Sequence, residues 1–214
     1  PMRKILFIDR DGTLIKEPED EQIDSIEKLT FYPKALIYLS KIARELDYEL
    51  VMITNQDGLG TEFFPEETFW PAHNFIIKTF YNEGVYFSKQ YIDRSFAKDN
   101  SPDRKPNTGL LTKYFSEEYD LQNSVVIGDR LTDVELAKNL NAKAIFINNH
   151  SYLGQEEISI KRQELEKFIS LETNDWQKIY EHLKLANRTA QVVRKTNETD
   201  VQIELNLDGT GKSA

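Results

Sequence analysis

Two carboxylates separated by one residue follow the first apolar segment of the chain. Asp9 and Asp11 come directly after Ile5–Ile8, and Gly12 completes an Asp-x-Asp-Gly turn. A short run of Ile, Leu and Phe that ends in a turn predicts a buried strand. Charged groups at the end of a buried strand are costly and so suggest a function, whereas a solvated Asp-Gly turn needs none. The tetrapeptide by itself leaves both interpretations open.

Other polar residues stand at equivalent places further along the chain. Three of them end later apolar segments and one lies in a polar loop: Thr54, Asn55, Asp129 and Lys105. In open α/β sheets the carboxyl ends of the strands form the ligand crevice. We therefore expect these side chains to converge with Asp9 and Asp11, which favours the functional interpretation of the turn.

Carboxylates that face one another repel unless a cation lies between them, and their hard oxygen atoms suit Mg²⁺. Mg²⁺ in turn binds phosphate, whose other oxygens suit the hydroxyl, amide and ammonium groups of Thr54, Asn55 and Lys105. An Asp nucleophile would divide phosphate-ester hydrolysis into two steps through an aspartyl-phosphate. A second carboxyl group would move the proton. The set of residues thus predicts phosphoryl chemistry.

Apolar strands alternate with helical patterns over the first 150 residues. This alternation predicts a doubly wound parallel α/β sheet of the Rossmann type. We expect Pro33 at the first position of a helix and a capping box between Thr132 and Glu135. The expected strands are 5–8, 50–53, 85–92, 124–129 and 144–147, and the expected helices are 33–46, 66–83, 108–119 and 133–140.

The pattern changes after residue 150. We expect residues 151–187 to form a helical linker, and the period-two alternation from Thr189 predicts a β-hairpin. Val201, Ile203, Leu205 and Leu207 share one face of this hairpin, with no later segment to cover them. We therefore interpret 1–150 as an α/β domain and 188–214 as the truncated start of a second domain. An uncovered apolar edge also predicts self-association through the hairpin.

Composition excludes several classes of protein. The formal net charge of −9 argues against nucleic-acid binding, and no apolar stretch approaches the roughly 20 residues of a membrane span. The chain has no cysteine, and its three histidines, His73, His150 and His182, lie far apart and are expected at the surface or its boundary. We therefore expect a cytoplasmic protein without disulfides or a cysteine zinc site.

The polar motifs also resemble a known family. Residues 7–14 (FIDRDGTL), 53–56 (ITNQ), 104–106 (RKP) and 127–133 (IGDRLTD) resemble the four signatures of haloacid-dehalogenase-type phosphatases. Residues 52–60 (MITNQDGLG) resemble more narrowly the histidinol-phosphate phosphatase domain of the bifunctional histidine-biosynthesis enzyme. Residues 194–200 (RKTNETD) resemble the opening of the dehydratase domain that follows it. The resemblance covers about 1–150 and 188–212.

This resemblance implies a role for each matching residue. Asp9 would be the nucleophile and a Mg²⁺ ligand, and Asp11 the general acid and base that also gives its main-chain carbonyl to the metal. Asp129 would complete the metal site, while the phosphoryl group would be held by Thr54, Asn55 and Lys105. Asp133 would either support the metal site from behind or only stabilise the start of its helix.

The chain departs from the resemblance in one loop. Phosphatases of this subgroup carry a Cys/His zinc loop before the Arg-Lys-Pro motif, but residues 93–103 contain neither Cys nor His. A structural zinc site needs four such ligands. We predict no zinc, and expect turns formed by Asp, Asn and Pro to hold the loop that presents Lys105.

No insertion between Thr13 and Pro33, or between Asn55 and Lys105, is long enough for a full cap domain. The site should be open and take a small phosphorylated metabolite. Histidinol phosphate, the substrate that the resemblance implies, carries an amine and an imidazole. Glu17, Gln22 and Asp24 would complement these groups, or would form only an ordinary solvated acidic loop.

Three other functions remain open at this point. The substrate could be a sugar bisphosphate, such as a heptose bisphosphate, although the dehydratase-like tail argues against it. The chain could also be a lyase fragment whose first domain is a scaffold, but residues 188–214 lack the histidines that such a dehydratase needs. A phosphate-binding protein without activity is disfavoured because both Asp9 and Asp11 are present.

Overall fold

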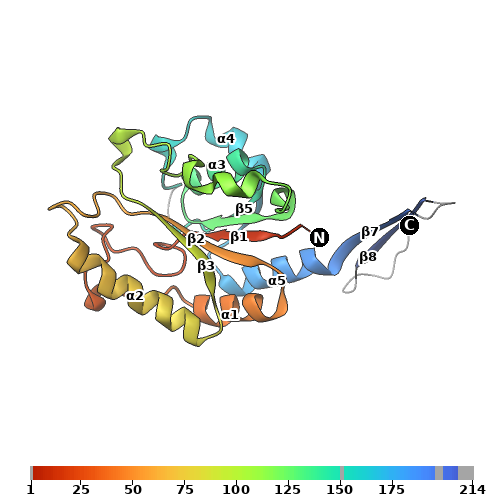
Figure 1. The fold of residues 1–214 in the computed structure, drawn as a ribbon, viewed down its shortest axis with the longest axis horizontal. Helices are drawn as coiled ribbons and strands as arrows, with labels where there is room; N and C mark the ends of the chain where they lie inside the picture. Colours follow the sequence, from red (N-terminus) through yellow and green to blue (C-terminus); the bar gives the residue numbers. More distant parts are fainter. Residues whose placement is uncertain (1, 150–151, 196–199, 207–214) are drawn as a thin grey trace.

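The computed structural model describes residues 2–149, 152–195 and 200–206, and its account of side chains ends at Arg188. Six strands of this part form one parallel sheet in the order β3-β2-β1-β4-β5-β6 (Figure 1). Their bounds are β1 Ile5–Ile8, β2 Glu49–Asn55, β3 Phe87–Asp93, β4 Val125–Gly128, β5 Lys143–Phe146 and β6 Ile169–Glu172. The strand order reverses between β1 and β4, which confirms the predicted doubly wound fold and places its ligand crevice there.

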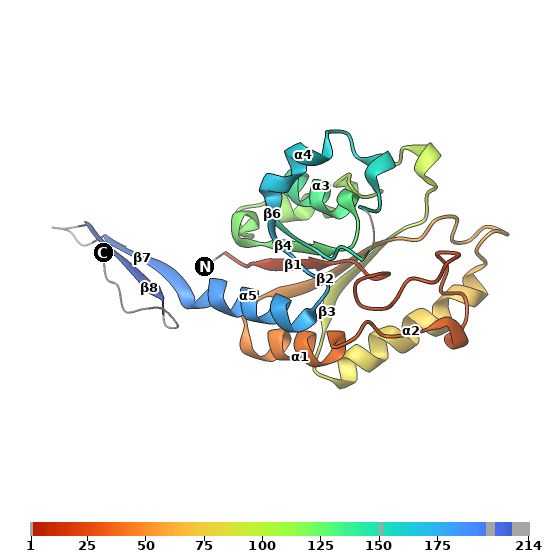
Figure 2. The same ribbon diagram turned by 180° about the vertical axis from the view of Figure 1, so that it is seen from behind.

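Helices cover both faces of the sheet (Figures 1 and 2). One face carries α1 (Ala35–Glu45), α2 (Glu66–Asn82) and α5 (Trp176–Arg188), and the other carries α3 (Leu131–Leu140) and α4 (Arg162–Leu165). Successive side chains of β1 alternate between the two layers, with Leu6 and Ile8 in one core and Ile5 and Phe7 in the other. Shorter 3-10 helices are Ile26–Lys28, Ala97–Asp99, Gly109–Phe115, Leu121–Asn123, Gln155–Glu157 and Glu166–Phe168.

Several predicted helix starts are wrong. Helix α1 begins at Ala35 rather than Pro33, because Lys34 takes a left-handed conformation with φ 68°. The expected helix at 108–119 is a 3-10 helix, Gly109–Phe115. The predicted capping box is also wrong, because Thr132 already lies inside α3. Instead the Asp133 carboxylate accepts from the Arg130 backbone N–H at 3.1 Å.

The segment 151–187 is not the helical linker that we predicted. Strand β6 pairs with β5 inside the sheet, and α5 packs on the same core. Trp176 is fully buried, and its indole Nε1 donates to the Thr13 carbonyl at 2.9 Å, which ties α5 to the turn after β1. The apolar residues Ile169 and Leu171 are two apart, a strand spacing that the surrounding charged residues obscured.

The C-terminal hairpin is confirmed. Strands β7 (Thr189–Lys195) and β8 (Asp200–Asn206) pair antiparallel, and the pair extends away from the sheet at the end of α5 (Figure 2). Leu207 lies outside the described residues, and the proposed apolar face lies beyond the described side chains. The division at residue 188 and self-association through the hairpin stay predictions. No helix in the described part is long and apolar enough to cross a membrane.

Candidate active site and metal centre

The turn after β1 places Asp9 beside Asp129. The Asp9 backbone N–H donates to the Ile127 carbonyl at 2.9 Å and thereby extends the pairing of β1 with β4. Gly12 has φ +80°, and a Cβ atom on it would lie 1.9 Å from Asp129 Oδ2. Only glycine therefore lets the turn pass so close to this carboxylate.

Lys105 reaches the same point from the loop after β3. Its Nζ donates to Asp9 Oδ1 and Asp133 Oδ1, both at 2.8 Å, and to the Ile53 carbonyl at 3.1 Å. Burial by itself lowers the pKa of Lys105, but the charges of Asp133 and Asp9 outweigh it and raise the pKa above its usual value. The ammonium group is thus held charged with all three of its protons donated.

The end of β2 contributes Thr54 and Asn55. Asn55 clamps the loop, because its amide donates to the Lys105 carbonyl at 3.3 Å and its Oδ1 accepts from the Lys105 backbone N–H at 3.2 Å. The buried Thr54 hydroxyl accepts from Gln56 Nε2 at 2.9 Å, and the same nitrogen donates to Asp11 Oδ2 at 3.1 Å. Gln56, which the sequence analysis did not single out, therefore links the two strand ends.

Asp129 is the unusual group of the site. It is 2% exposed, and neither carboxylate oxygen has a hydrogen-bond partner among the described residues. Burial, followed by the charges of Asp9 and Asp133, raises its pKa well above the usual range. A buried unpaired carboxylate is costly unless a cation neutralises it.

Ligand atoms of Asp9, Asp129 and Asp133 lie within 4.8 Å of one another. Three carboxylates, of which Asp129 has no partner among the described residues, offer the hard oxygen ligands that Mg²⁺ prefers. Asp11 does not join this carboxylate cluster, because its side chain turns toward Arg10 and Gln56. Its predicted contribution through the main-chain carbonyl is separate from that orientation and stays a prediction.

Asp133 has both of its oxygens occupied. Oδ1 accepts from Lys105, and Oδ2 accepts from the Arg130 backbone N–H at the start of α3. Burial raises its pKa to about 6, while Lys105 acts in the opposite direction. Asp133 therefore makes a contact that corresponds to each of its two predicted roles. It supports the site by binding Lys105, and it caps the start of its own helix.

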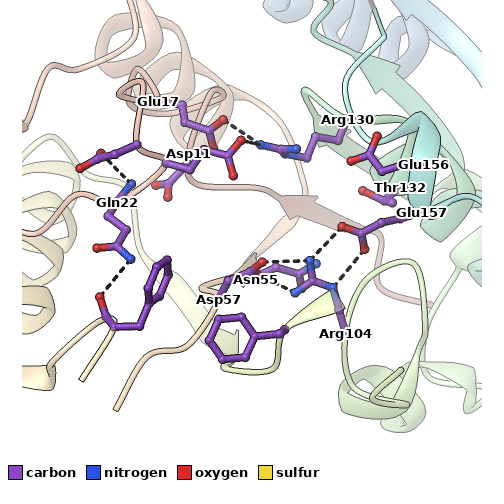
Figure 3. A pocket seen from close by; sticks show the side chains of 14 residues that line it. Asp11, Glu17, Gln22, Asn55, Asp57, Arg104, Arg130, Thr132, Glu156 and Glu157 are labelled. Carbon is purple, nitrogen blue, oxygen red and sulfur yellow. Dashed lines mark hydrogen bonds and ion pairs between the residues drawn. The ribbon is translucent and has the colours of Figure 1, made fainter. Parts of the chain in front are cut away.

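A pocket of about 310 Å³ adjoins Asp11 (Figure 3). Most of its charged residues are acidic. The residues that line it are Asp11, Glu17, Asp20, Glu21, Gln22, Asn55, Asp57, Phe63, Phe96, Arg104, Arg130, Thr132, Glu156 and Glu157. Glu17 Oε1 accepts from Arg130 Nη2 at 2.7 Å. Burial raises the pKa of Glu17 to about 7, against the opposing charge of Arg130.

The three predicted substrate-binding residues separate in the structure. Glu17 and Gln22 line the pocket, and Gln22 Nε2 donates to the Phe63 carbonyl at 3.3 Å. Asp24 does not line it; its carboxylate pairs with Lys28 Nζ at 2.8 Å, four residues along the chain. A local ion pair thus turns Asp24 away from the role that the sequence suggested.

Side-chain contacts hold the loop that presents Lys105. Asp93 Oδ2 accepts from the Ser95 backbone N–H at 3.1 Å, and Asp99 Oδ2 accepts from the Phe96 backbone N–H at 2.9 Å. Arg104 binds Asp57 at 2.6 Å and Glu157 at 2.9 Å (Figure 3). Turn chemistry and an arginine bridge thus join this loop to its neighbours, and the lack of zinc stays a prediction.

The expectation that His73 lies at the surface or its boundary is wrong. It lies on the inner side of α2 and is 1% exposed, with Nδ1 3.0 Å from Arg10 Nη1 and Nε2 2.8 Å from Gln90 Oε1. The buried arginine between Asp9 and Asp11 is the partner that sequence spacing could not reveal. His182 is half-buried, and His150 lies outside the described residues.

Residues 103–164 match a family described as HAD-hydrolase-like. The chain is 55% identical to the histidine biosynthesis bifunctional protein HisB of Spirosoma linguale, over 99% of this chain and 56% of that protein. It is 54% identical to HisB of Bacteroides fragilis, over 98% of this chain and 55% of that protein. The chain thus spans about half the length of these curated relatives.

Solved structures share the fold. One is D,D-heptose 1,7-bisphosphate phosphatase from B. bronchiseptica complexed with magnesium and phosphate, with a TM-score of 0.68, 19% identity and coverage of 85% of this chain and 98% of that chain. Another is a HAD-like phosphatase from Mesorhizobium loti, with a TM-score of 0.65, 20% identity and coverage of 88% and 89%. At such identities the likeness shows the fold alone.

Proposed function

Because the chain is a haloacid-dehalogenase-like domain that matches bifunctional HisB proteins over nearly all of its length, as its motifs predicted, we propose that it hydrolyses L-histidinol phosphate. The products are L-histidinol and phosphate. The observation that carries this proposal is the unpartnered Asp129 carboxylate beside the Asp9–Lys105 pair. A site of this kind needs a divalent cation and has a nucleophile next to it.

Asp9 is the proposed nucleophile. Its Oδ1 accepts from Lys105 at 2.8 Å and its Oδ2 from the Thr13 hydroxyl at 3.1 Å, so the carboxylate has a fixed orientation. Asp9 attacks phosphorus, the bond from phosphorus to the histidinol oxygen breaks, and Asp11 gives a proton to that oxygen. Water then attacks the aspartyl-phosphate, Asp11 takes a proton from the water, and phosphate leaves Asp9.

The remaining residues hold charge. Thr54 and Asn55 lie at the end of β2, and Lys105 reaches the same edge of the sheet from its loop, where phosphoryl oxygens would be bound. Mg²⁺, held by the carboxylates of Asp9 and Asp129, would offset the negative charge of the phosphoryl group. The burial of this set limits the access of bulk water, which strengthens each electrostatic contact.

The adjoining pocket supports an organic cation as the rest of the substrate. Seven carboxylates line it against two guanidinium groups, and both guanidinium groups are paired with carboxylates. The rings of Phe63 and Phe96 lie 5.7 Å apart at the same pocket. A flat imidazolium and an amine fit carboxylates and phenyl faces. A second phosphate, as in a sugar bisphosphate, would meet a mostly negative lining.

A magnesium-dependent assay tests this proposal. Wild type should release phosphate from histidinol phosphate at a higher kcat/KM than from a heptose 1,7-bisphosphate. Asp9→Asn should lose at least about 10³-fold in kcat, because the amide that replaces the carboxylate cannot form the acyl phosphate. Asp47→Asn changes an exposed carboxylate in the same way and is the matched control. Full activity of Asp9→Asn would refute the aspartyl-phosphate route.

We further infer that residues 188–214 open a dehydratase-like second domain. The antiparallel hairpin of β7 and β8 and the motif at 194–200 support this inference. A biosynthetic metabolite as substrate and the absence of cysteine fit a cytoplasmic location.

A further inference from the structure

A chain of hydrogen bonds leads from Asp11 through the buried side chains of Arg10 and His73 to the exposed Gln90 of strand β3. We propose that His73 is a positioning residue that holds Arg10, and through Arg10 the Asp11 carboxylate, in the orientation needed for proton transfer. The proposal rests on the phosphatase function, because proton transfer by Asp11 belongs to that reaction. Arg10 is next to Asp11 in the sequence, whereas His73 and Gln90 are far from both along the chain.

Arg10 has almost no freedom to move. It is fully buried, its Nε donates to Asp11 Oδ1 at 2.7 Å, and its Nη2 donates to Asp11 Oδ2 at 3.3 Å. The guanidinium carbon lies 5.0 Å from the centre of the Phe69 ring. The third nitrogen, Nη1, is directed to His73. His73 therefore holds the side of the planar guanidinium group that is not bonded to Asp11.

The contacts of His73 require one tautomer. Arginine can only donate hydrogen bonds, so His73 Nδ1 must accept, and the proton must be on Nε2. Nε2 then donates to Gln90 Oε1 at 2.8 Å. The ring also stacks on Phe69, with centroids 4.9 Å apart. Burial and the adjacent Arg10 charge lower the pKa of His73 to about 4, so the imidazole stays neutral and able to accept.

This arrangement distinguishes the two oxygens of Asp11. Oδ2 accepts from Arg10 Nη2 and from Gln56 Nε2, which fills both of its acceptor positions. Oδ1 accepts from Arg10 Nε alone among the described residues. Because Asp11 lines the pocket, Oδ1 is the oxygen with a lone pair left for the proton of the leaving group. If Arg10 rotates, that lone pair no longer has a fixed direction.

The test compares two leaving groups. Histidinol is an alkoxide leaving group and needs a proton, whereas 4-nitrophenolate leaves from 4-nitrophenyl phosphate without one. Each kcat/KM value reports the step that expels the leaving group. The kcat/KM for histidinol phosphate divided by that for 4-nitrophenyl phosphate therefore measures proton donation. His73→Phe keeps the stacking but loses the acceptor, and the ratio should fall by about 10–100-fold, within the range of general acid catalysis. His73→Gln keeps an acceptor and should restore the ratio to within about threefold of wild type.

Controls separate positioning from stability. Phe80→Leu alters a buried residue about two helical turns further along α2 than His73, and it should leave the ratio unchanged. Gln90→Leu removes only the far partner of His73 and should lower the ratio in the same direction if His73→Phe does not fold. Equal losses on both substrates in the His73 variants would overturn the proposal.

Nitrogen-15 NMR of the imidazole gives a readout independent of activity. His73 should show an unprotonated Nδ1 and a protonated Nε2 from pH 5 to pH 8. Protonation at Nδ1 in that range would overturn the proposed chain even in an active enzyme. If wild type hydrolyses neither substrate, the proposed function fails, while the NMR result still decides whether His73 accepts from Arg10.

Discussion

Replacing Asp129 should have opposite effects on stability with and without Mg²⁺. In the metal-free protein its buried carboxylate has no hydrogen-bond partner in the part of the chain that the structure describes, so it is either charged at a cost or protonated. Protonation at pH 7 of a carboxyl with an ordinary pKa of 3.8 costs about 4 kcal/mol, which is the upper bound. We expect Asp129→Asn to stabilise the metal-free protein by about 1–3 kcal/mol, since the amide still lacks partners.

Mg²⁺ should reverse that order. At a free Mg²⁺ concentration one thousand times Kd, binding adds about 4.1 kcal/mol to wild-type stability. For a domain of this size this raises Tm by about 8–16 °C. Asp129→Asn should lose most of the increase, because the remaining carboxylates of the cluster are already bonded to Lys105. Thermal unfolding by circular dichroism, in EDTA and across a Mg²⁺ titration, measures both effects.

The pH dependence has a definite sign. The folded pKa of Asp129 is raised, so between its unfolded pKa near 4 and its folded pKa the native protein binds more protons than the unfolded chain. The contribution of this group therefore makes the metal-free protein less stable as pH rises through that window. Protons should also compete with Mg²⁺ at the lower end of the window.

Two results would contradict this reasoning. One is an equal rise in Tm with Mg²⁺ in wild type and Asp129→Asn. The other is an Asp129→Asn protein that is less stable than wild type in EDTA. Asp47→Asn, which changes an exposed carboxylate, should behave as wild type in both conditions and controls for the change in net charge.

Three further predictions concern the surroundings of the site. Lys105→Met should abolish phosphatase activity and lower the free energy of unfolding in urea by about 3–5 kcal/mol. The reason is that it leaves two buried carboxylates without their cation. Unchanged stability would contradict the buried ion pairs. Glu17→Gln should raise KM for histidinol phosphate by about tenfold but not KM for 4-nitrophenyl phosphate, as a lost ion pair with a cation predicts. Since the pKa of Glu17 is raised to about 7, wild-type KM should fall as pH rises through 7, whereas Asp24→Asn should keep that dependence and Glu17→Gln should lose it. Gly12→Ala should lower the free energy of unfolding by more than about 2 kcal/mol in the same urea experiment. Gly84 has a similar φ of +83°, but a Cβ atom there would meet no atom of the described residues within 4 Å. Gly84→Ala should therefore cost only about 1 kcal/mol.

Much of the site can be predicted from the order of residues along the chain. Apolar strands that alternate with helices form a parallel sheet, and all strands of such a sheet end at the same edge. Asp9, Thr54 and Asp129 each end a strand, so their proximity follows from the fold class alone. Lys105 lies in a loop without a regular period, and only the Arg-Lys-Pro motif indicated its place.

Local competition decided the features that prediction missed. Asp133 rather than Thr132 caps α3, because the helix begins two residues earlier than the polar pattern suggested, at Leu131. Asp24 pairs with Lys28, four residues away, instead of facing the pocket. Strand β6 lies among charged residues, so its two apolar positions gave too weak a period to distinguish it from a helix.

The sequence by itself determined the chemistry of this protein, because residue types at strand ends specify oxygen ligands, a nucleophile and a cation. Only the tertiary structure decided how these groups are oriented. Arg10, His73 and Gln90 come from the turn after β1, from α2 and from β3, and they meet through packing that no spacing along the chain encodes. Whether a buried polar group has a partner depends on every element around it. For that reason the missing partner of Asp129 and the fixed rotation of Asp11 could be seen only in the folded protein.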